Sequence, residues 1–381
     1  MRIAPYSRFL SVPRSGIASR IHALLLMAIC ASLALIQITP AQVGATARPA
    51  LPAPLGLPHP GEPGRAAYAP LPIVPGGIVI PLYPPSSPHL KADRVREAER
   101  YNMSQIVPAR ISSIVNIHNP SIEIHLVERS LNTGAAVILA AGGGHRTLNV
   151  GTESADFVPF FYNFGVNTII LRNRLRSDGY EPRTDGVRDA LQAIRIVRAY
   201  ADELHIDPHK IGIMGFSAGA ELSAATAVLY GGSADTAIDP ADPFAEVPAR
   251  PDFVGIIYPG PSPFAANRTA PPVPADAPPA FIASGGPGDK VHAVWAIEYY
   301  SAMLAAGIPN IELHLYGNGR HPGDPLPDGS RMTGGLTHRN GIPFGTWQDR
   351  FTDWFRDLGF LEKPGIETKA ARDLAAIAIK P

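Results

Sequence analysis

A serine between two glycines is the residue of this 381-residue chain whose surroundings most directly indicate chemistry. The segment 215–219 (GFSAG) follows the apolar run 211–216 and precedes a helical pattern over 218–229. In such a strand–turn–helix context the serine hydroxyl stands clear of the sheet, and the helix N-terminus behind it favours developing negative charge. Ser217 is therefore predicted to be a nucleophile, and a plain tight turn is the alternative.

A run of three glycines follows an earlier apolar segment, because 141–146 (AGGGHR) comes directly after 135–141 (AAVILAA). Backbone N–H groups of such a turn can approach a ligand closely. Two fixed N–H donors stabilise the oxyanion of a tetrahedral intermediate by about 3–4 kcal/mol each. The alternatives are a flexible turn or a phosphate loop, but the Lys-Ser/Thr pair of a phosphate loop does not follow. The candidate oxyanion donors are the amides of Gly143, Gly144 and Ala218.

A serine nucleophile needs a base to take its proton and a carboxylate to orient that base. In this kind of fold the chain order is serine, acid, histidine. Asp289 lies on the glycine-rich turn after the apolar run 280–284, and His321 lies on the loop after 311–316. These two residues are the predicted acid and base. The rival acids are Asp239 and Asp276, and the rival histidines are His292 and His338.

Short apolar runs alternate with helical periods between residues 110 and 360. The segment 121–129 alternates polar and apolar residues, as a half-buried strand does. The apolar runs are 135–141, 166–171, 211–216, 253–258, 280–284 and 311–316, and the helical periods are 185–204, 218–229, 293–306 and 347–358. This alternation predicts an α/β domain with a mostly parallel central sheet and helices on both faces. Ligands of such sheets bind beyond the carboxyl ends of the strands, where the three candidate loops lie.

The composition excludes several classes of function. Thirty-three Lys and Arg balance 33 Asp and Glu, so no basic excess is present to bind the phosphates of a nucleic acid. Cys30 is the one cysteine, which excludes disulfides within the chain, cysteine-rich zinc sites and a thiolate nucleophile in the domain. Neither a metal nor an organic cofactor is expected.

The N-terminal region has the pattern of a signal peptide. Residues 1–22 carry four arginines and no acidic residue, and the apolar stretch 23–38 follows. This stretch is shorter than the roughly 20 residues that cross a bilayer as a helix. The small residues of 45–47 (ATA) then suit a signal peptidase. The prediction is a cleaved leader and a secreted or periplasmic protein without stable membrane insertion. The alternative is an uncleaved anchor.

The remaining chain is divided by composition. Residues 48–75 are predicted to be a Pro-rich linker or arm outside the fold. Residues 76–362 are the predicted catalytic domain, and 363–381 form a C-terminal tail. Two insertions rich in Pro, Ala and Asp, 231–250 and 259–279, are expected to cover the pocket.

The chain resembles the acetyl-xylan-esterase-like group of α/β-hydrolase esterases, whose members are often labelled esterase/lipase or xylanase. The resemblance covers about 81–361 and is most specific in the segment from the helix to the nucleophile turn. It rests on 81–84 (PLYP), 115–120 (VNIHNP), the triple glycine, 189–222 (DALQAIRIVRAYADELHIDPHKIGIMGFSAGAEL), Asp289 and His321. It implies the α/β-hydrolase fold, Ser217 as nucleophile, Asp289 as acid, His321 as base and 142–144 as oxyanion loop.

These patterns together predict a serine carboxylic-ester hydrolase acting through an acyl-enzyme. The resemblance implies a short acyl group, acetyl foremost, on a carbohydrate or a similar small ester. Two alternatives stay open. One is a serine peptidase of the prolyl-peptidase type, which shares the serine turn and the chain order. The other is a non-catalytic binding module on the same scaffold. The sequence does not indicate an oligomeric state.

Overall fold

The computed structural model describes residues 48–54, 66–232, 239, 241–325, 329–336 and 344–378. The predicted signal peptide, 1–47, and the rival histidine His338 lie outside these described residues. No helix of the described ranges is both long enough and apolar enough to span a bilayer.

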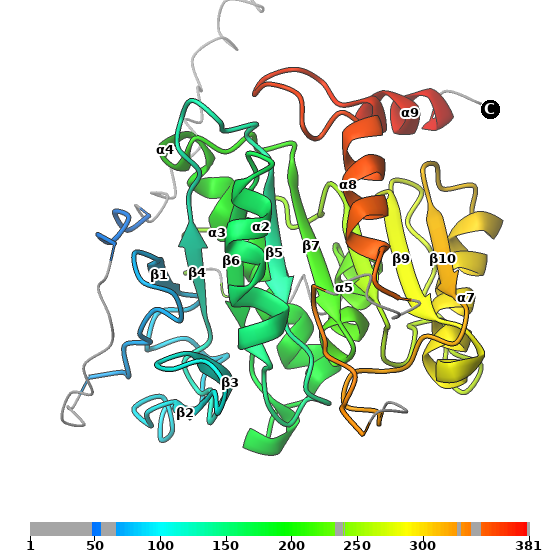
Figure 1. Ribbon diagram of the computed structural model, residues 1–381. Coiled ribbons are helices and arrows are strands. Elements are labelled where there is room, and N and C mark those ends of the chain that lie inside the picture. The colour runs from blue at the N-terminus through cyan, green and yellow to red at the C-terminus, as the bar shows by residue number, and fades with distance from the viewer. Residues whose placement is uncertain are drawn as a thin grey trace, which may run out of the picture. The chain divides into compact units, whose positions relative to one another are not determined.

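An eight-stranded sheet is the centre of the domain, with the strand order β1-β4-β6-β5-β7-β8-β9-β10 (Figure 1). Its strands are β1 (Ile78–Pro81), β4 (Ser121–His125), β5 (Ala136–Ala140), β6 (Asn167–Arg172), β7 (Ile211–Phe216), β8 (Val254–Ile257), β9 (Ala280–Gly285) and β10 (Glu312–Tyr316). Strand β4 pairs antiparallel with both β1 and β6, and every pair from β6 to β10 is parallel. The predicted mostly parallel sheet is confirmed. A separate two-stranded sheet pairs β2 (Arg100–Met103) with β3 (Ile111–Val115).

Helices cover both faces of the large sheet, as predicted (Figure 1). Helices α3 (Val187–Ala199), α5 (Ala218–Leu229) and α7 (Lys290–Ala305) pack on one face, where alternate residues of the strands meet them. Helices α2 (Phe157–Tyr162) and α8 (Trp347–Asp357) pack on the other face, and α9 (Lys369–Ala378) lies beyond the ends of the strands, next to the end of α8 (Figure 1). Strands covered on both faces carry side chains with no polar alternation. This explains the uninterrupted apolar runs of β5 and β7, which are buried throughout.

The predicted helix 185–204 is divided into three elements. A π-helical turn, η4 (Pro182–Gly186), precedes α3, and α4 (Ala201–Leu204) follows after Tyr200 leaves the helical conformation. Proline at the first position of η4 suits the start of a helix, because its missing N–H would have no partner there. The remaining short helices are η2 (Gly151–Ala155), η3 (Arg176–Asp178) and η5 (Pro287–Asp289).

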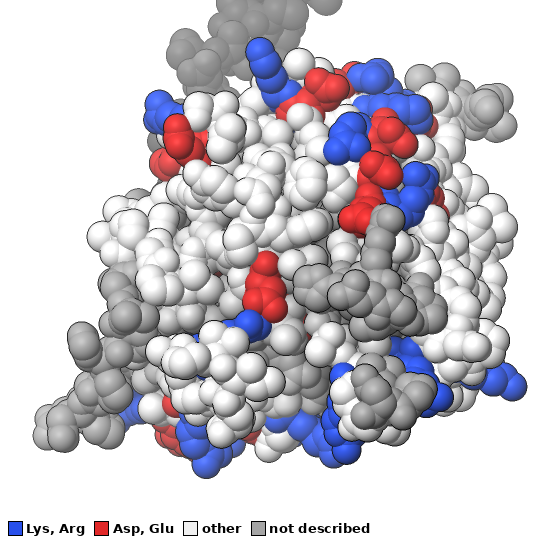
Figure 2. Space-filling model, viewed as in Figure 1, with Lys and Arg blue, Asp and Glu red and all other residues white. Residues whose placement is uncertain are grey.

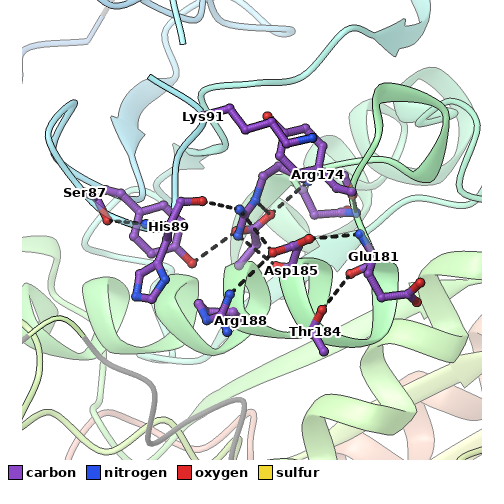
Figure 3. A network of polar contacts seen from close by, with 12 residues as sticks. Ser87, His89, Lys91, Arg174, Glu181, Thr184, Asp185 and Arg188 are labelled. Carbon is purple, nitrogen blue, oxygen red and sulfur yellow. Dashed lines mark hydrogen bonds and ion pairs between the residues drawn. The ribbon is translucent and has the colours of Figure 1, made fainter. Parts of the chain in front are cut away.

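A buried polar network fixes the connection from β6 to α3 (Figure 3). The Arg174 guanidinium donates to the Asp189 carboxylate, at 2.7 Å from Nη2, and to the carbonyl oxygens of His89 and Asp185. The Tyr83 hydroxyl donates to the same carboxylate at 3.1 Å. Arg174 and Asp189 are both buried, so each compensates the charge of the other. The network thereby joins the chain around His89 to the turn η4 and to α3.

The described parts of the predicted arm and tail contact the domain. The Ile73 N–H donates to Glu123 of β4 at 2.5 Å, and the Tyr68 carbonyl accepts from Asn119 at 2.6 Å. In the tail, the Gly365 N–H donates to the Asp207 carboxylate at 2.9 Å. These hydrogen bonds attach both segments to the sheet or to the loops beside it.

Candidate active site

Ser217 lies at the junction of β7 and α5 in a strained backbone conformation. Its φ of 52° and ψ of −118° are unusual for a residue with a side chain. The flanking glycines make this turn possible. A Cβ atom on Gly219 would lie 1.9 Å from the Ala140 carbonyl oxygen, and one on Gly215 would lie 2.0 Å from the Gly219 carbonyl oxygen. The spacing of the two glycines therefore follows from packing against β5 and within the turn itself.

The structure brings Ser217, His321 and Asp289 together. The Ser217 Oγ lies 3.0 Å from His321 Nε2, and His321 Nδ1 lies 3.3 Å from Asp289 Oδ2. When the imidazole proton is on Nδ1 and donated to Asp289, Nε2 can accept the proton of the serine hydroxyl. The 3.3 Å separation is long, and such hydrogen bonds tighten when the histidine becomes charged during the reaction.

The rival acids lie elsewhere. The Asp276 carboxylate accepts a hydrogen bond from the Tyr230 hydroxyl at 2.7 Å and pairs with Arg250. Asp239 accepts from the Ala241 N–H at 2.9 Å. The rival histidine His292 instead shares the Asp289 carboxylate with His321, at 2.5 Å between its Nδ1 and Oδ1.

The Asp289 carboxylate is ionised at neutral pH. Burial works to raise its pKa, but the hydrogen bonds from His292 and His321 outweigh burial and lower the pKa to about 2. A carboxylate that stays charged can stabilise an imidazolium at His321.

The glycine turn lies against the serine. A Cβ atom on Gly142 would lie 2.9 Å from the Cβ atom of Ser217. Gly143 and Gly144 have φ values of 128° and 64°, which glycine adopts at little cost. Within the described part of the chain, the N–H groups of Gly143, Gly144 and Ala218 donate to no protein acceptor. These three amides remain the candidate oxyanion donors.

Glu153 and Tyr258 support this turn, and the sequence reasoning missed both. The Gly142 N–H donates to Glu153 Oε2 at 2.7 Å, so this amide is not an oxyanion donor. The Tyr258 hydroxyl donates to Glu153 Oε1 at 3.0 Å and accepts from the Gly335 N–H at 2.7 Å. The edge of the Tyr258 ring meets His321, with 5.4 Å between ring centroids. Tyr258 therefore touches the predicted base and, through Glu153, the predicted oxyanion loop.

Burial raises the pKa of Glu153 from 4.5 to about 7, although the hydrogen bonds from Gly142 and Tyr258 act in the opposite direction. The folded protein therefore binds a proton at Glu153 that the unfolded chain has released between these pH values. The contribution of this group to stability is present below pH 4.5 and is lost as the pH rises through 7.

We expect Glu153→Gln to remove this pH dependence. From pH 4.5 to pH 8 the free energy of unfolding of the wild type should fall relative to the variant by about 3 kcal/mol, since each pKa unit corresponds to about 1.4 kcal/mol. Urea unfolding of both proteins across this pH range measures the difference. Glu246→Gln, at an exposed position, is the control. A wild-type-to-variant difference that stays constant with pH would contradict the expectation.

Glu221 joins further loops at the site, one turn of α5 after Ser217. Its carboxylate accepts from His145 Nε2 at 3.0 Å and from Arg268 Nη2 at 2.9 Å. Burial opposes ionisation of Glu221, but these two partners outweigh it and lower its pKa. The carboxylate therefore links His145, which follows the glycine turn, to Arg268 in the insertion 259–279. The second part of that insertion lies beside Arg250, with which Asp276 is paired.

Charged side chains gather at two margins of the molecule (Figure 2). Lys and Arg prevail along the lower margin in this view, where the parallel strands of Figure 1 end. Ser217 follows one of those strand ends, β7.

Asp289, His292 and His321 place possible metal-ligand atoms within 4.8 Å of one another. The two imidazole rings, however, are stacked 3.7 Å apart and only 11° from parallel. A ring nitrogen binds a metal ion in the plane of its ring, and one ion cannot lie in two stacked planes. The arrangement suits hydrogen bonding to a shared carboxylate and does not suit a metal centre.

The chain is similar to several known proteins. Residues 122–253 match the family model described as BD-FAE. An acetylxylan esterase from Xylanibacter ruminicola is 27% identical over 253 residues, which are 60% of this chain and 45% of that protein. Endo-1,4-beta-xylanase B from Butyrivibrio fibrisolvens is 33% identical over 100 residues, which are 26% of this chain and 15% of that protein. The chain spans less than half the length of these two relatives.

Two solved structures are similar in fold to this chain. The acetyl ester-xyloside bifunctional hydrolase from Caldicellulosiruptor lactoaceticus superposes with a TM-score of 0.51 and is 23% identical in sequence. The superposition covers 74% of this chain and 96% of that protein's chain. The esterase Est2 from Thermogutta terrifontis superposes with a TM-score of 0.50 and is 20% identical in sequence. This superposition covers 66% of this chain and 91% of that protein's chain. The predicted α/β-hydrolase fold and the resemblance to acetyl-xylan-esterase-like proteins are confirmed.

Proposed function

We propose that this α/β-hydrolase is a serine carboxylic-ester hydrolase that removes short acyl groups, acetyl foremost, from a carbohydrate or a similar small ester. The observation that carries the proposal is the hydrogen-bonding distance of 3.0 Å between Ser217 Oγ and His321 Nε2. It is supported by the ionised carboxylate of Asp289 behind the imidazole and by the glycine turn in front of the serine.

In the first half of the reaction, His321 Nε2 takes the hydroxyl proton of Ser217 while Oγ attacks the ester carbonyl carbon. The carbonyl π-electrons move to oxygen and form a tetrahedral oxyanion. When the intermediate collapses, the bond to the alcohol oxygen breaks, and His321 gives the proton to that oxygen. The products of this half are the free alcohol and an acyl-Ser217 ester.

In the second half, His321 takes a proton from water, whose oxygen attacks the acyl carbon. Collapse of the second intermediate breaks the bond to Ser217 Oγ, which recovers its proton from His321, and the carboxylic acid leaves. Asp289 stabilises the imidazolium in both halves and does not itself become protonated.

The oxyanion of both intermediates is held by backbone amides. The N–H groups of Gly143, Gly144 and Ala218 are the donors, since the Gly142 N–H is already bound to Glu153. The positive end of α5, which begins at Ala218, adds to the stabilisation. Fixed donors of this kind need no rearrangement when charge develops.

The acyl group and the compartment are proposed from the relatives and from the N-terminal sequence. Two of the similar proteins are named for acetyl esters, one as an acetylxylan esterase and one as an acetyl ester-xyloside hydrolase. The leader pattern in 1–47 supports a secreted or periplasmic enzyme that meets its ester outside the cytoplasm.

A substrate series tests the proposal. We expect kcat/KM for p-nitrophenyl esters to fall at least tenfold from acetate to octanoate, and acetate to be released from acetylated xylan. The assay should include an aminoacyl p-nitroanilide of similar shape. Faster cleavage of the anilide than of the esters would instead support the peptidase alternative. Binding of esters without turnover or acylation would support a non-catalytic module.

A further inference from the structure

His292 contacts both members of the acid–base pair. Its Nδ1 lies 2.5 Å from Asp289 Oδ1, whereas His321 Nδ1 lies 3.3 Å from the other carboxylate oxygen. Its ring is stacked on the ring of His321, with 3.7 Å between centroids. The two histidines come from different parts of the chain, because His292 is in the first turn of α7 and His321 follows β10.

The Asp289 carboxylate depends on these two imidazoles. Within the described residues, no backbone N–H and no other side chain donates to its oxygens. A carboxylate held only at Oδ2, by a 3.3 Å hydrogen bond, could rotate about its Cβ–Cγ bond. The second and shorter hydrogen bond, to Oδ1, stops this rotation. His292 therefore sets the direction in which Oδ2 faces His321.

The ring of His292 is itself held in place. The edge of Trp295 meets it at 5.2 Å between centroids and 85° between planes. His292 is three residues after Asp289, so α7 presents its side chain back toward the carboxylate. The His321 ring also contacts the ring of Tyr258, at 86° between planes. The imidazole of His321 thus contacts two rings, one stacked on it and one perpendicular to it.

We infer that His292 is a positioning residue, a second imidazole that orients the Asp289 carboxylate toward His321 through its Nδ1–H. This inference rests on the proposed function, because it assigns His292 to the same reaction. With the carboxylate fixed, Asp289 Oδ2 is already directed at His321 Nδ1 when the proton arrives from Ser217. Proton transfer from Ser217 to His321 then needs little rearrangement. Loss of the His292 hydrogen bond should therefore lower kcat rather than weaken binding of the ester.

Two substitutions separate the hydrogen bond from the ring. In His292→Asn, the amide N–H lies at the same distance from the backbone as Nδ1–H and can donate to Oδ1, but the ring is lost. In His292→Phe, a ring remains for stacking on His321, but the donor is lost. Val294→Ala, at an exposed position of the same helix, is the matched control.

We expect His292→Phe to lower kcat for p-nitrophenyl acetate about tenfold, with KM within twofold of the wild type. His292→Asn should restore kcat to within threefold, and Val294→Ala should match the wild type. The rate of labelling of Ser217 by a fluorophosphonate should follow kcat across the series. Thermal unfolding of each variant shows whether a lower kcat comes from misfolding. The kcat values of His292→Phe and His292→Asn are compared at a temperature at which both variants are fully folded.

The experiment distinguishes failure of the positioning role of His292 from failure of the proposed function. A wild type that neither hydrolyses esters nor reacts with the fluorophosphonate overturns the proposed function. An active wild type with an equally active His292→Phe variant overturns the positioning role. Equal losses in His292→Phe and His292→Asn also overturn it, because the donor then makes no difference.

Discussion

Ser217→Ala is expected to lower turnover of p-nitrophenyl acetate by up to about six decades, to residual catalysis by the remaining site. The physical reason is that no other hydroxyl in the structure approaches His321 Nε2 among the described residues, where Ser217 Oγ lies at 3.0 Å. Without Oγ, no acyl-enzyme forms, and His321 has only water to activate. Initial rates over a wide range of enzyme concentration measure the loss.

The control for this substitution is Ser301→Ala, which removes an exposed hydroxyl from α7. It should keep the wild-type rate and the wild-type reaction with a fluorophosphonate, whereas Ser217→Ala should not be labelled. A Ser217→Ala variant that hydrolyses the ester at the wild-type rate would remove the basis of the proposed mechanism. Labelling of that variant at a single other serine would locate the nucleophile elsewhere.

Asp289→Asn is expected to lower kcat by about four decades. The amide that replaces the carboxylate carries no charge and has only one acceptor oxygen for two imidazoles. If its NH₂ group faces His321, Nδ1 must become the acceptor, and the proton moves to Nε2. An Nε2 that carries the proton cannot take another from Ser217. The loss is therefore expected in kcat, while KM for a neutral ester should change little.

Asp276→Asn is the informative control, because Asp276 was the rival acid and is paired with Tyr230 and Arg250. It should leave kcat unchanged. Since the pKa of Asp289 is about 2, protonation of this carboxylate cannot cause a loss of activity in the wild type between pH 4 and 8. An intact rate in Asp289→Asn together with a large loss in Asp276→Asn would reverse the assignment of the acid.

The main elements of the fold could be predicted from the sequence because they are buried on both sides. Strand β7 and helix α5 have the predicted bounds, 211–216 and 218–229. Their apolar runs are long, and glycines at the junction mark the turn. The short strands β2 and β3 could not be predicted in the same way. Strand β2 is largely exposed, so no apolar run marks it.

Ser217, Asp289 and His321 could also be predicted as candidates from the sequence, because each follows a strand and their order along the chain is informative. Glu153 and Tyr258 could not be predicted in this way. Their contact spans 105 positions and joins two polar atoms inside the protein, and neither residue belongs to a motif. The role of His292 was equally hidden. Its closeness to the acid in the sequence was visible, but the stacking on His321 depends on how β10 lies beside β9.

The position of Tyr258 has a practical consequence for anyone who redesigns this protein. One phenol forms a common wall between the loop after β5 and the loop after β10, so a substitution there disturbs two parts of the machinery at once. Arg268 is coupled to the site in a similar way, because its partner Glu221 also accepts a hydrogen bond from His145 beside the glycine turn. Mutant libraries aimed at new esters would therefore do better at positions whose side chains bind neither Glu153 nor Glu221.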